Sequence, residues 1–422
     1  MQKPNPNSRK IVLFGHFGQY NFGNESTLQA ILHHLRNRFE NPELICVCTR
    51  PEATTAAYNI ESMPIRGSIA GPWKTRSAAL QLLRKIVIGL PNEMCQWVIP
   101  FRVLASADLF IVPGTGLLTD AFGMMGWGPY NIFKWSLIAK LCGCKVVFLS
   151  VGSGPFCSVV GKWLTKCALA CADFRSYRDD ATSKYLEKIG VKTDGDYVFP
   201  DLAFSLPQTE LPEHVSCERE RRLVGIGVMH YESMYGEDRP NEDMYGKYCE
   251  TLVQFTEWLL SNGYDVRFLI GDLGDKSVAQ DLIEHFGEHL RKVHQGIVIN
   301  EPVGSVDELL RQISSTDVVV ATRFHNVLLA LLLNKPVISL SFHSKCTSLM
   351  RAMGLSEYCQ QIGQLSLSEL IEQFREVEKD GRKLKAQIRH ETDQCRRALD
   401  EQYELVFGAG MRVKPVESPE LA

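Results

Sequence analysis

Along the first half of the chain, short hydrophobic runs alternate with longer segments that have hydrophobic residues at helical spacing. The runs at 11–14 and 44–48 predict buried strands, and the segment 26–38 between them predicts a helix. The same pattern predicts further strands at 108–112, 145–151 and 174–177 and further helices at 132–141, 160–172 and 180–189. Strands that alternate with helices predict a parallel sheet with helices on both faces.

A polar segment interrupts this pattern at residues 207–222, which are rich in Pro, Glu and Arg. A buried strand is expected directly after it at 223–228, so the segment is interpreted as an interdomain linker. The pattern then repeats, with strands expected at 265–270, 316–321 and 336–340 and helices at 245–262, 277–289 and 327–333. A second parallel sheet is therefore predicted.

These patterns together predict an α/β protein of two Rossmann-like domains whose parallel sheets face a cleft. The first domain is expected to cover residues 1–206 and the second residues 223–365, with 207–222 as the linker. A charged helical segment at 366–410 and a tail at 411–422 complete the expected organisation.

One stretch, residues 72–102, departs from the alternation because it carries basic side chains among large hydrophobic ones. Its basic residues are Lys74, Arg76, Arg84, Lys85 and Arg102. Two interpretations fit this stretch. It is either a basic amphipathic helix in peripheral contact with an anionic membrane, or a helix that covers a domain and has one solvated side. The second interpretation is the more ordinary one.

The composition is that of an ordinary globular protein, with 45% hydrophobic and 23% charged residues among 422. A formal net charge of −3 gives no support for nucleic-acid binding, so any anion site must be local. The first ten residues lack the apolar stretch of a signal peptide, and no run reaches the roughly 18 apolar residues of a membrane helix. The thirteen cysteines show no paired spacing typical of zinc ligands. We therefore expect reduced thiols and a cytoplasmic protein.

Three potential cations lie around two predicted strands of the second domain. Arg323 and His325 follow the strand at 316–321, where it meets a helix, and Lys345 follows the next strand. Both positions are on the carboxyl edge of a parallel sheet, where open α/β folds bind ligands. A lone histidine is often structural, so its nearness to Arg323 is the stronger signal. Convergence of the three groups predicts an anionic ligand.

The loop 15-GHFGQYNFGNES-26 follows the first strand and leads into the first helix. Its glycines allow tight turns and close approach of a ligand to the backbone, and a helix N-terminus favours an anion. The spacing differs from GxGxxG, which argues against a nicotinamide cofactor. A purely structural turn is an equal alternative, and Glu25 suits the first turn of a helix without any catalytic role. The candidates in this loop are Gly18, Asn21, Gly23, Asn24 and Glu25.

Two more glycine-bearing loops are expected on the same rim. The turn 113-PGTG-116 follows one buried strand, and 150-SVGSGP-155 closes the next. Three such loops at one sheet edge favour a binding cleft over coincidence. The candidates in the first of these turns are Gly114, Thr115 and Gly116.

Arg178 and Asp201 are candidates near the end of the first domain. Arg178 follows the strand at 174–177, and its guanidinium either clamps a carboxylate or phosphate or pairs with Asp179 or Asp180. Asp201, in 200-PDLAFSL-206, either shapes the floor of the cleft or bonds within its own turn.

Taken together, these segments resemble the polysaccharide pyruvyl transferase family from residue 11 to about residue 355. The segments that carry the resemblance are GHFGQYNFGNES, PGTG, SYRDDATSKYLEKIGV, PDLAFSL and TRFHNVLLALLLNKPVISLSFHSK. Each motif is weak alone, but their order and spacing are specific. One departure is Asn24, which stands where the family usually has Asp. A catalytic role for that carboxylate would be lost with the amide, whereas a turn-stabilising role would survive.

The resemblance implies a fold like that of GT-B glycosyltransferases, phosphoenolpyruvate as donor and a sugar or lipid-linked glycan as acceptor. The implied product is a cyclic pyruvate ketal across two hydroxyls, made without a cofactor or a metal. The residues that the resemblance implies for binding phosphoenolpyruvate are Arg178, Arg323, His325 and Lys345. Among them, His325 is the candidate for proton transfer or for stabilising the departing phosphate. We then expect the protein in the cytoplasm, either free or peripheral at the inner face of the membrane.

Two other functions stay open on the residues alone. A GT-B glycosyltransferase that uses a nucleotide sugar would also need cations and rim loops around a diphosphate. A non-catalytic protein that binds a sugar or an anion would tolerate the amide of Asn24 in place of the carboxylate.

Overall fold

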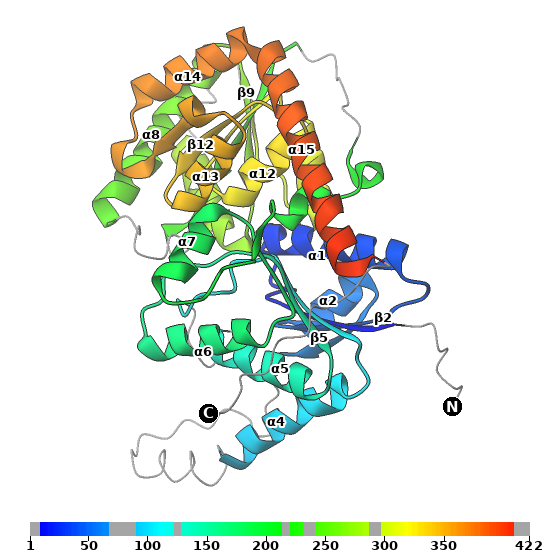
Figure 1. The fold of residues 1–422 in the computed structure, drawn as a ribbon. Helices are drawn as coiled ribbons and strands as arrows, with labels where there is room; N and C mark the ends of the chain where they lie inside the picture. Colours follow the sequence, from blue (N-terminus) through cyan, green and yellow to red (C-terminus); the bar gives the residue numbers. More distant parts are fainter. Residues whose placement is uncertain are drawn as a thin grey trace, which may run out of the picture.

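The computed structural model contains two parallel β-sheets, each covered by helices and placed one above the other in Figure 1. The residues that the structure describes are 9–66, 90–121, 128–212, 220–231, 241–286 and 297–408. Each sheet belongs to one half of the chain, and most strands are hydrophobic runs buried on both faces. The predicted fold class, α/β with two Rossmann-like halves, is confirmed.

The N-terminal sheet has the strand order β3-β2-β1-β4-β5-β6-β7, with every pair parallel. In chain order the strands are β1 (Lys10–Phe14), β2 (Glu43–Cys48), β3 (Glu61–Pro64), β4 (Leu109–Pro113), β5 (Lys145–Val151), β6 (Phe174–Tyr177) and β7 (Tyr197–Val198). Its helices are α1 (Phe22–Arg38), α2 (Pro51–Tyr58), α4 (Leu90–Leu104), α5 (Pro129–Leu141), α6 (Val159–Ala170) and α7 (Asp180–Lys188). The strand order reverses between β1 and β4, which leaves a crevice at their carboxyl ends.

The C-terminal sheet has the strand order β10-β9-β8-β11-β12-β13 and is also parallel. Its strands are β8 (Leu223–Val228), β9 (Asp265–Ile270), β10 (Val298–Ile299), β11 (Val318–Ala321), β12 (Val337–Ser341) and β13 (Cys359–Gln361). Its helices are α8 (Glu242–Ser261), α9 (Lys276–Phe286), α11 (Val306–Ser314), α12 (Phe324–Leu332), α13 (Ser344–Ala352) and α14 (Leu367–Lys379). Here the order reverses between β8 and β11, so this sheet has its own crevice at the corresponding edge.

The carboxyl edges of the two sheets face each other and touch. The backbone N–H of Phe22, just past the loop after β1, donates to the carbonyl of Gly271 after β9 over 3.1 Å. Asn21 and Asp272 form an isolated antiparallel bridge beside it. The two crevices therefore open into one interdomain space.

Several helices begin earlier than the sequence pattern predicted. α1 begins at Phe22 and not at residue 26, because the side chain of Asn21 accepts a hydrogen bond from the backbone N–H of Asn24 and caps the helix. α12 begins at Phe324 and not at residue 327. Candidates predicted in loops, such as Glu25, therefore lie in first turns of helices, where backbone N–H groups have no partner within the helix.

The long helix α15 (Gly381–Phe407) joins the two halves. Figure 1 shows it running from the C-terminal sheet back down to α1. Arg396 donates to the carbonyl of Leu206 over 3.0 Å, and the hydroxyls of Tyr403 and Ser205 are 2.8 Å apart. The charged C-terminal segment forms α14 and α15, and α15 packs on the first half of the chain as well as the second.

Two sequence predictions fall partly or wholly outside the described residues. Residues 72–89 of the basic stretch lie outside them, and the rest of that stretch contributes to α4. The predicted tail at 411–422 also lies outside them. Among the described helices, none has the length and apolar character needed to cross a membrane. The described cysteines are free thiols, several of them buried in the core, whereas Cys157 is exposed.

Candidate active site

A cavity of about 330 Å³ lies where the two crevices meet. Its lining comes from loops and helix starts at the carboxyl edges of both sheets. The lining residues are His16, Gln19, Asn21, Asn24, Thr115, Gly116, Leu117, Arg178, Met229, Gly271, Asp272, Arg323, Phe324, His325, Phe342 and Lys345. All four residues singled out for donor binding are among them. We call this space the interdomain cavity.

His325 enters the interdomain cavity from the first turn of α12 and packs directly on Gly23 in the first turn of α1. A Cβ atom built at position 23 would lie 1.8 Å from Nδ1, 2.1 Å from Cγ and 2.4 Å from Cε1 of His325. No side chain fits there unless the imidazole moves. The glycine of the sequence motif is therefore needed for close approach of the two domains.

The other ring nitrogen of His325 faces Asp201. Nε2 lies 3.7 Å from Oδ2 of Asp201, an ion-pair separation longer than a hydrogen bond, and both atoms lack hydrogen-bond partners among the described residues. Burial lowers the pKa of His325, and the charges of Arg178 and Lys345 add to this effect against Asp201. Burial alone would raise the pKa of the Asp201 carboxyl, but His325 and Arg178 outweigh it and hold that pKa below its ordinary value. These shifts favour an ionised carboxylate and disfavour the charged form of the imidazole.

Asp201 bonds within its own turn, one of the two roles considered for it, and also contacts two residues of the interdomain cavity. Its Oδ1 accepts a hydrogen bond from the backbone N–H of Ala203 over 3.0 Å and caps the short 3-10 helix Leu202–Ser205. Its Oδ2 lies between the imidazole of His325 and the guanidinium of Arg178, 3.5 Å from Nη1. The turn therefore fixes a buried carboxylate against Arg178 and His325, which line the interdomain cavity, whereas Asp201 itself does not line it.

Arg178 follows β6 and is almost fully enclosed, with a side chain 7% exposed. Its guanidinium lies over the ring of Phe324, 4.8 Å from the centroid, and its Nε is 3.4 Å from Asp179. Asp179 mainly caps α7, because its Oδ1 accepts the backbone N–H of Thr182 over 2.6 Å. Arg178 therefore does pair with Asp179, and it lines the interdomain cavity as well.

Arg323 is held by a carboxylate that the sequence pattern did not indicate. Nε and Nη2 donate to the two oxygens of the fully buried Asp275, both over 2.7 Å, and Nη1 lies 4.0 Å from Asp272. This bidentate pair offsets much of the positive charge of Arg323, which was expected to attract an anionic ligand. Arg323 therefore offers the cavity N–H donors in a fixed position more than it offers a net positive charge.

Lys345 lies in the first turn of α13, with its ammonium over the rings of Phe324 and Phe342 at 5.9 and 5.7 Å. Within the described part of the chain, no carboxylate lies at ion-pair distance from it. Burial, together with the charge of Arg178, lowers its pKa to about 8. Lys345 is therefore less neutralised than Arg178 or Arg323, each of which pairs with a carboxylate.

The loop after β1 reaches the interdomain cavity through its two asparagines. The amide of Asn21 donates to Asp272 of the other half over 2.9 Å. The amide of Asn24 donates to the carbonyl of His16 over 3.1 Å, which an ionised Asp could not do. Asn24 therefore has the turn-stabilising role that was considered for it.

The turn after β4 contributes one polar side chain and one structural glycine. Thr115 is 2% exposed, lines the interdomain cavity, and its hydroxyl has no hydrogen-bond partner among the described residues. Gly116 also lines the cavity. Gly114 does not, and a Cβ there would meet the carbonyl of Ser150 at 2.6 Å, so its role is backbone packing.

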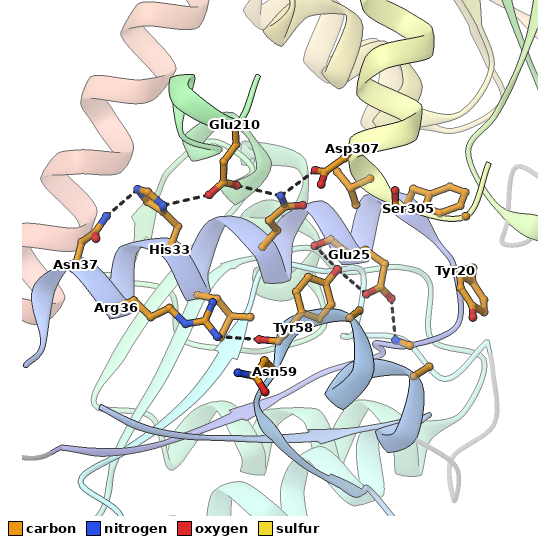
Figure 2. A pocket seen from close by; sticks show the side chains of 18 residues that line it. Tyr20, Glu25, His33, Arg36, Asn37, Tyr58, Asn59, Glu210, Ser305 and Asp307 are labelled. Carbon is orange, nitrogen blue, oxygen red and sulfur yellow. Dashed lines mark hydrogen bonds and ion pairs between the residues drawn. The ribbon is translucent and has the colours of Figure 1, made fainter. Parts of the chain in front are cut away.

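Two candidates of the first loop face a different space. Gly18 and Glu25 line a cavity of about 620 Å³ on another side of α1, shown in Figure 2. Glu25 accepts hydrogen bonds from the backbone N–H of Gly18 over 2.7 Å and the hydroxyl of Tyr58 over 2.9 Å, and burial raises its pKa. Several other polar groups there also bond to one another, as when Gln29 bridges Glu210 and Asp307. Glu25 therefore holds the loop and does not line the interdomain cavity.

Several lining residues were not found from the sequence. Asp272 lies after β9 at the same sheet edge, so the reasoning applied to the other strands would have found it. His16 carries no local signal, and burial lowers its pKa to about 4 despite Asp272. Within the described ranges, no group of His, Cys, Asp or Glu is arranged to hold a metal ion.

Two Rossmann-like halves with a polar cavity between their switch points define a GT-B-like protein, an architecture of glycosyltransferases and epimerases. A putative UDP-N-acetylglucosamine 2-epimerase from Listeria monocytogenes is similar with a TM-score of 0.60 and 14% identity, covering 94% of this chain and 97% of that one. The UDP-GlcNAc 2-epimerase from Methanocaldococcus jannaschii is similar with a TM-score of 0.55 and 12% identity, covering 87% of this chain and 92% of that one. A glycosyltransferase from Rickettsia africae is similar with a TM-score of 0.53 and 9% identity, covering 95% of this chain and 99% of that one. Identities this low show the fold alone.

The chain belongs to the polysaccharide pyruvyl transferase family, whose sequence profile matches residues 21–344. It is therefore an enzyme of polysaccharide biosynthesis that transfers pyruvate. The match begins at the capping Asn21 and ends at Ser344, beside Lys345, so it spans both edges of the interdomain cavity. None of the curated proteins compared with the chain matches it.

Proposed function

We propose that the enzyme transfers pyruvate from phosphoenolpyruvate to two hydroxyls of a sugar in a polysaccharide or its precursor, forming a cyclic ketal and releasing phosphate. The observation that carries this proposal is the gathering of Arg178, Arg323, His325 and Lys345 around one cavity. Phosphoenolpyruvate has a carboxylate and a phosphate on three carbons, so its site needs several donors within a small space.

Each cation is proposed to bind a different part of phosphoenolpyruvate, depending on how far nearby carboxylates neutralise its charge. Lys345 supplies the strongest unpaired charge, and phosphate is its natural partner. Arg178, whose guanidinium is fixed by Phe324 and Asp201, supplies a rigid fork for the carboxylate. Arg323 supplies N–H donors whose position is fixed by the hydrogen bonds to Asp275. Donors fixed in advance cost little reorganisation when the reaction begins.

The proposed reaction uses His325 as the carrier of one proton. Imidazolium gives its proton to the methylene carbon of phosphoenolpyruvate, which becomes a methyl group beside an oxocarbenium-like carbon. The first sugar hydroxyl adds to that carbon, and its proton returns to His325. The carbon–oxygen bond to phosphate then breaks, the second hydroxyl closes the ketal, and its proton leaves with phosphate. No cofactor or metal takes part in this scheme.

The electrostatics of His325 suit that role once the donor is present. Burial and the neighbouring cations lower its pKa, which favours the neutral ring while no anion is bound. A bound phosphate and carboxylate would counter the charges of those cations and so favour the imidazolium. Asp201 orients the ring through Nε2 and stabilises its charged form. The donor thus promotes the protonation that its own conversion requires.

We place this reaction in the cytoplasm, where phosphoenolpyruvate and a sugar or lipid-linked glycan acceptor are both available. The test is incubation of the enzyme with phosphoenolpyruvate and a panel of candidate glycans. Phosphate release and the mass gain of a pyruvate ketal are the expected products. His325→Ala should lower turnover by about 100-fold or more, whereas His390→Ala, at an exposed position on α15, should not.

Other outcomes of the same experiment would contradict the proposal. Release of a nucleoside diphosphate from a nucleotide sugar would instead identify a glycosyltransferase. Thermal stabilisation by phosphoenolpyruvate without turnover on any acceptor would identify a binding protein. Near-normal turnover in His325→Ala would remove that residue from the mechanism.

A further inference from the structure

Helices α4, α5 and α6 lie at the end of the molecule farthest from the C-terminal sheet (Figure 1), and α5 packs against both of the others. Most of the large hydrophobic side chains that are exposed among the described residues are on these three helices. They are Met94, Val98 and Phe101 on α4, Leu141 on α5, and Val159, Val160 and Trp163 on α6. We call this region the α4–α6 surface.

The spacing of these residues places them on continuous faces. Met94, Val98 and Phe101 are four and three residues apart, so they share one face of α4. Val160 and Trp163 likewise share one face of α6, and the Trp163 ring lies 6.2 Å from that of Phe133 on α5. Exposure is large, at 72% for Met94 and 57% for Trp163. Apolar groups gathered in this way mark a surface that is covered in use.

The charges on the same helices are strongly unequal in sign. The sequences of α5 and α6 contain no Asp or Glu, and that of α4 contains only Glu93. Glu93 is already engaged, because its carboxylate accepts the hydroxyl of Tyr130 over 2.6 Å and pairs with Arg66 at 3.1 Å. The basic residues of the three helices are Arg102, Lys134, Lys140, Lys162 and Lys166.

Two of these cations are also engaged within the protein. Lys134 is fully buried and faces Glu93, and Lys140 pairs with Asp173 at 2.5 Å. Arg102 and Lys162 remain at or near the surface beside the exposed apolar residues, and the half-buried Lys166 donates to the carbonyl of Ile189 over 3.4 Å. The α4–α6 surface is therefore both apolar and positively charged.

We propose that the α4–α6 surface rests on an anionic phospholipid membrane. Its apolar side chains would enter the headgroup region, with Trp163 at the interface, while the ends of Arg102 and Lys162 reach lipid phosphates. A protein partner would also cover apolar groups, but protein interfaces are depleted in Lys. The combination of tryptophan, aliphatic side chains and cations matches a lipid surface better.

This contact gives the proposed function a place to act. The N-terminal half forms one wall of the interdomain cavity and also carries the α4–α6 surface, so a docked enzyme would meet a glycan held on a lipid carrier. Only this choice of acceptor rests on the proposed function. The membrane contact is measured without phosphoenolpyruvate or any acceptor, so the two can fail separately.

The experiment is sedimentation of the full chain with vesicles of phosphatidylcholine, alone or mixed with phosphatidylglycerol. The test variant replaces Phe101 and Trp163 by Glu. The control replaces Ile297 and Leu405 by Glu, because these residues are also exposed and apolar, and the change in net charge is the same. Thermal unfolding midpoints of all three proteins confirm that each is folded.

We expect the unaltered protein and the control to bind mixed vesicles, and the test variant to bind about tenfold less or weaker still. Binding should be weak on phosphatidylcholine alone and should fall with added salt, because exposed charges are screened. Binding of the test variant equal to that of the control would overturn the proposal. So would failure of the unaltered protein to bind mixed vesicles, or a dimer in solution that only the test variant disrupts.

Discussion

At the scale of single residues, the site depends on glycines that bring no chemistry of their own. Gly23 allows the imidazole of His325 to lie against α1, and Gly152 does the same for Arg178, since a Cβ at 152 would lie 2.5 Å from Nη2. Each glycine therefore fixes a functional side chain from a distant part of the chain. The side chains themselves are tuned by burial and by their neighbours, as the lowered pKa values of His325 and Lys345 show.

Gly23→Ala should lower pyruvate transfer by displacing His325. A misplacement of about 1 Å at a catalytic group costs roughly 100-fold, and a methyl group at position 23 leaves the ring no room. Gly246→Ala is the matched control, because Gly246 is exposed on α8 and an added Cβ meets nothing within 4 Å. Initial rates of phosphate release with phosphoenolpyruvate and a glycan acceptor measure the effect. Equal rates in the two variants would show that His325 does not need its present position.

Binding of phosphoenolpyruvate should weaken as the pH rises through about 8, the pKa to which burial lowers Lys345. Below that pH the ammonium is charged and attracts the donor, and above it the amine is neutral. If the donor binds only to the charged form, affinity falls by up to about tenfold for each pH unit above the pKa. Calorimetric titration with phosphoenolpyruvate at a series of pH values measures this dependence.

Lys345→Arg provides the control for that dependence. A guanidinium stays charged throughout this range, so the affinity of the variant should be nearly independent of pH there. A decline in Lys345→Arg as steep as in the unaltered enzyme would assign the titration to another group.

At the scale of elements, first turns of helices deliver the chemistry, and α15 supports the rim from behind. His325 and Lys345 lie in the first turns of α12 and α13, and Arg323 directly precedes α12. The unpaired N–H groups of such turns favour bound anions and add to the charge of the side chains. Gln402 of α15 bonds to Ser150 in β5 and Ser176 in β6, two residues before Gly152 and Arg178. The C-terminal helix therefore supports the rim loops after β5 and β6, which lie more than half the chain earlier in the sequence.

Gln402→Ala should lower the free energy of unfolding by about 1–3 kcal/mol, because it leaves the buried hydroxyl of Ser150 without a partner and removes one hydrogen bond from that of Ser176. The residue is fully buried, so water cannot readily replace the amide. Gln394→Ala on the same helix is exposed and should change stability by no more than about 0.5 kcal/mol. Urea unfolding of both variants tests this difference. A loss in Gln402→Ala no larger than in Gln394→Ala would mean that α15 does not brace the rim.

At the scale of the whole molecule, the interdomain cavity exists only because two crevices face each other. Arg178 and Asp201 come from the first half, and Arg323, His325 and Lys345 come from the second. The amide of Asn21 and the N–H of Phe22 bond directly across the junction. A donor bound there would contact both halves at once, so the geometry of the halves controls the chemistry.

The sequence by itself determined the parallel sheets, their two-part organisation and the family. Hydrophobic runs and helical spacing are local properties, and the carboxyl edge of a parallel sheet follows from strand order alone. The cations predicted at that edge, Arg178, Arg323, His325 and Lys345, do line one cavity.

Only the tertiary structure decided what each of these groups can do. Asp275 offsets the charge of Arg323, Asp201 faces His325, and Glu25 bonds to Tyr58 in a different cavity. Helix starts also differed from the predicted ones, since a cap such as Asn21 depends on a single side-chain hydrogen bond. These contacts join residues far apart in the chain, and charge, burial and exact approach depend on such neighbours, which no local pattern specifies.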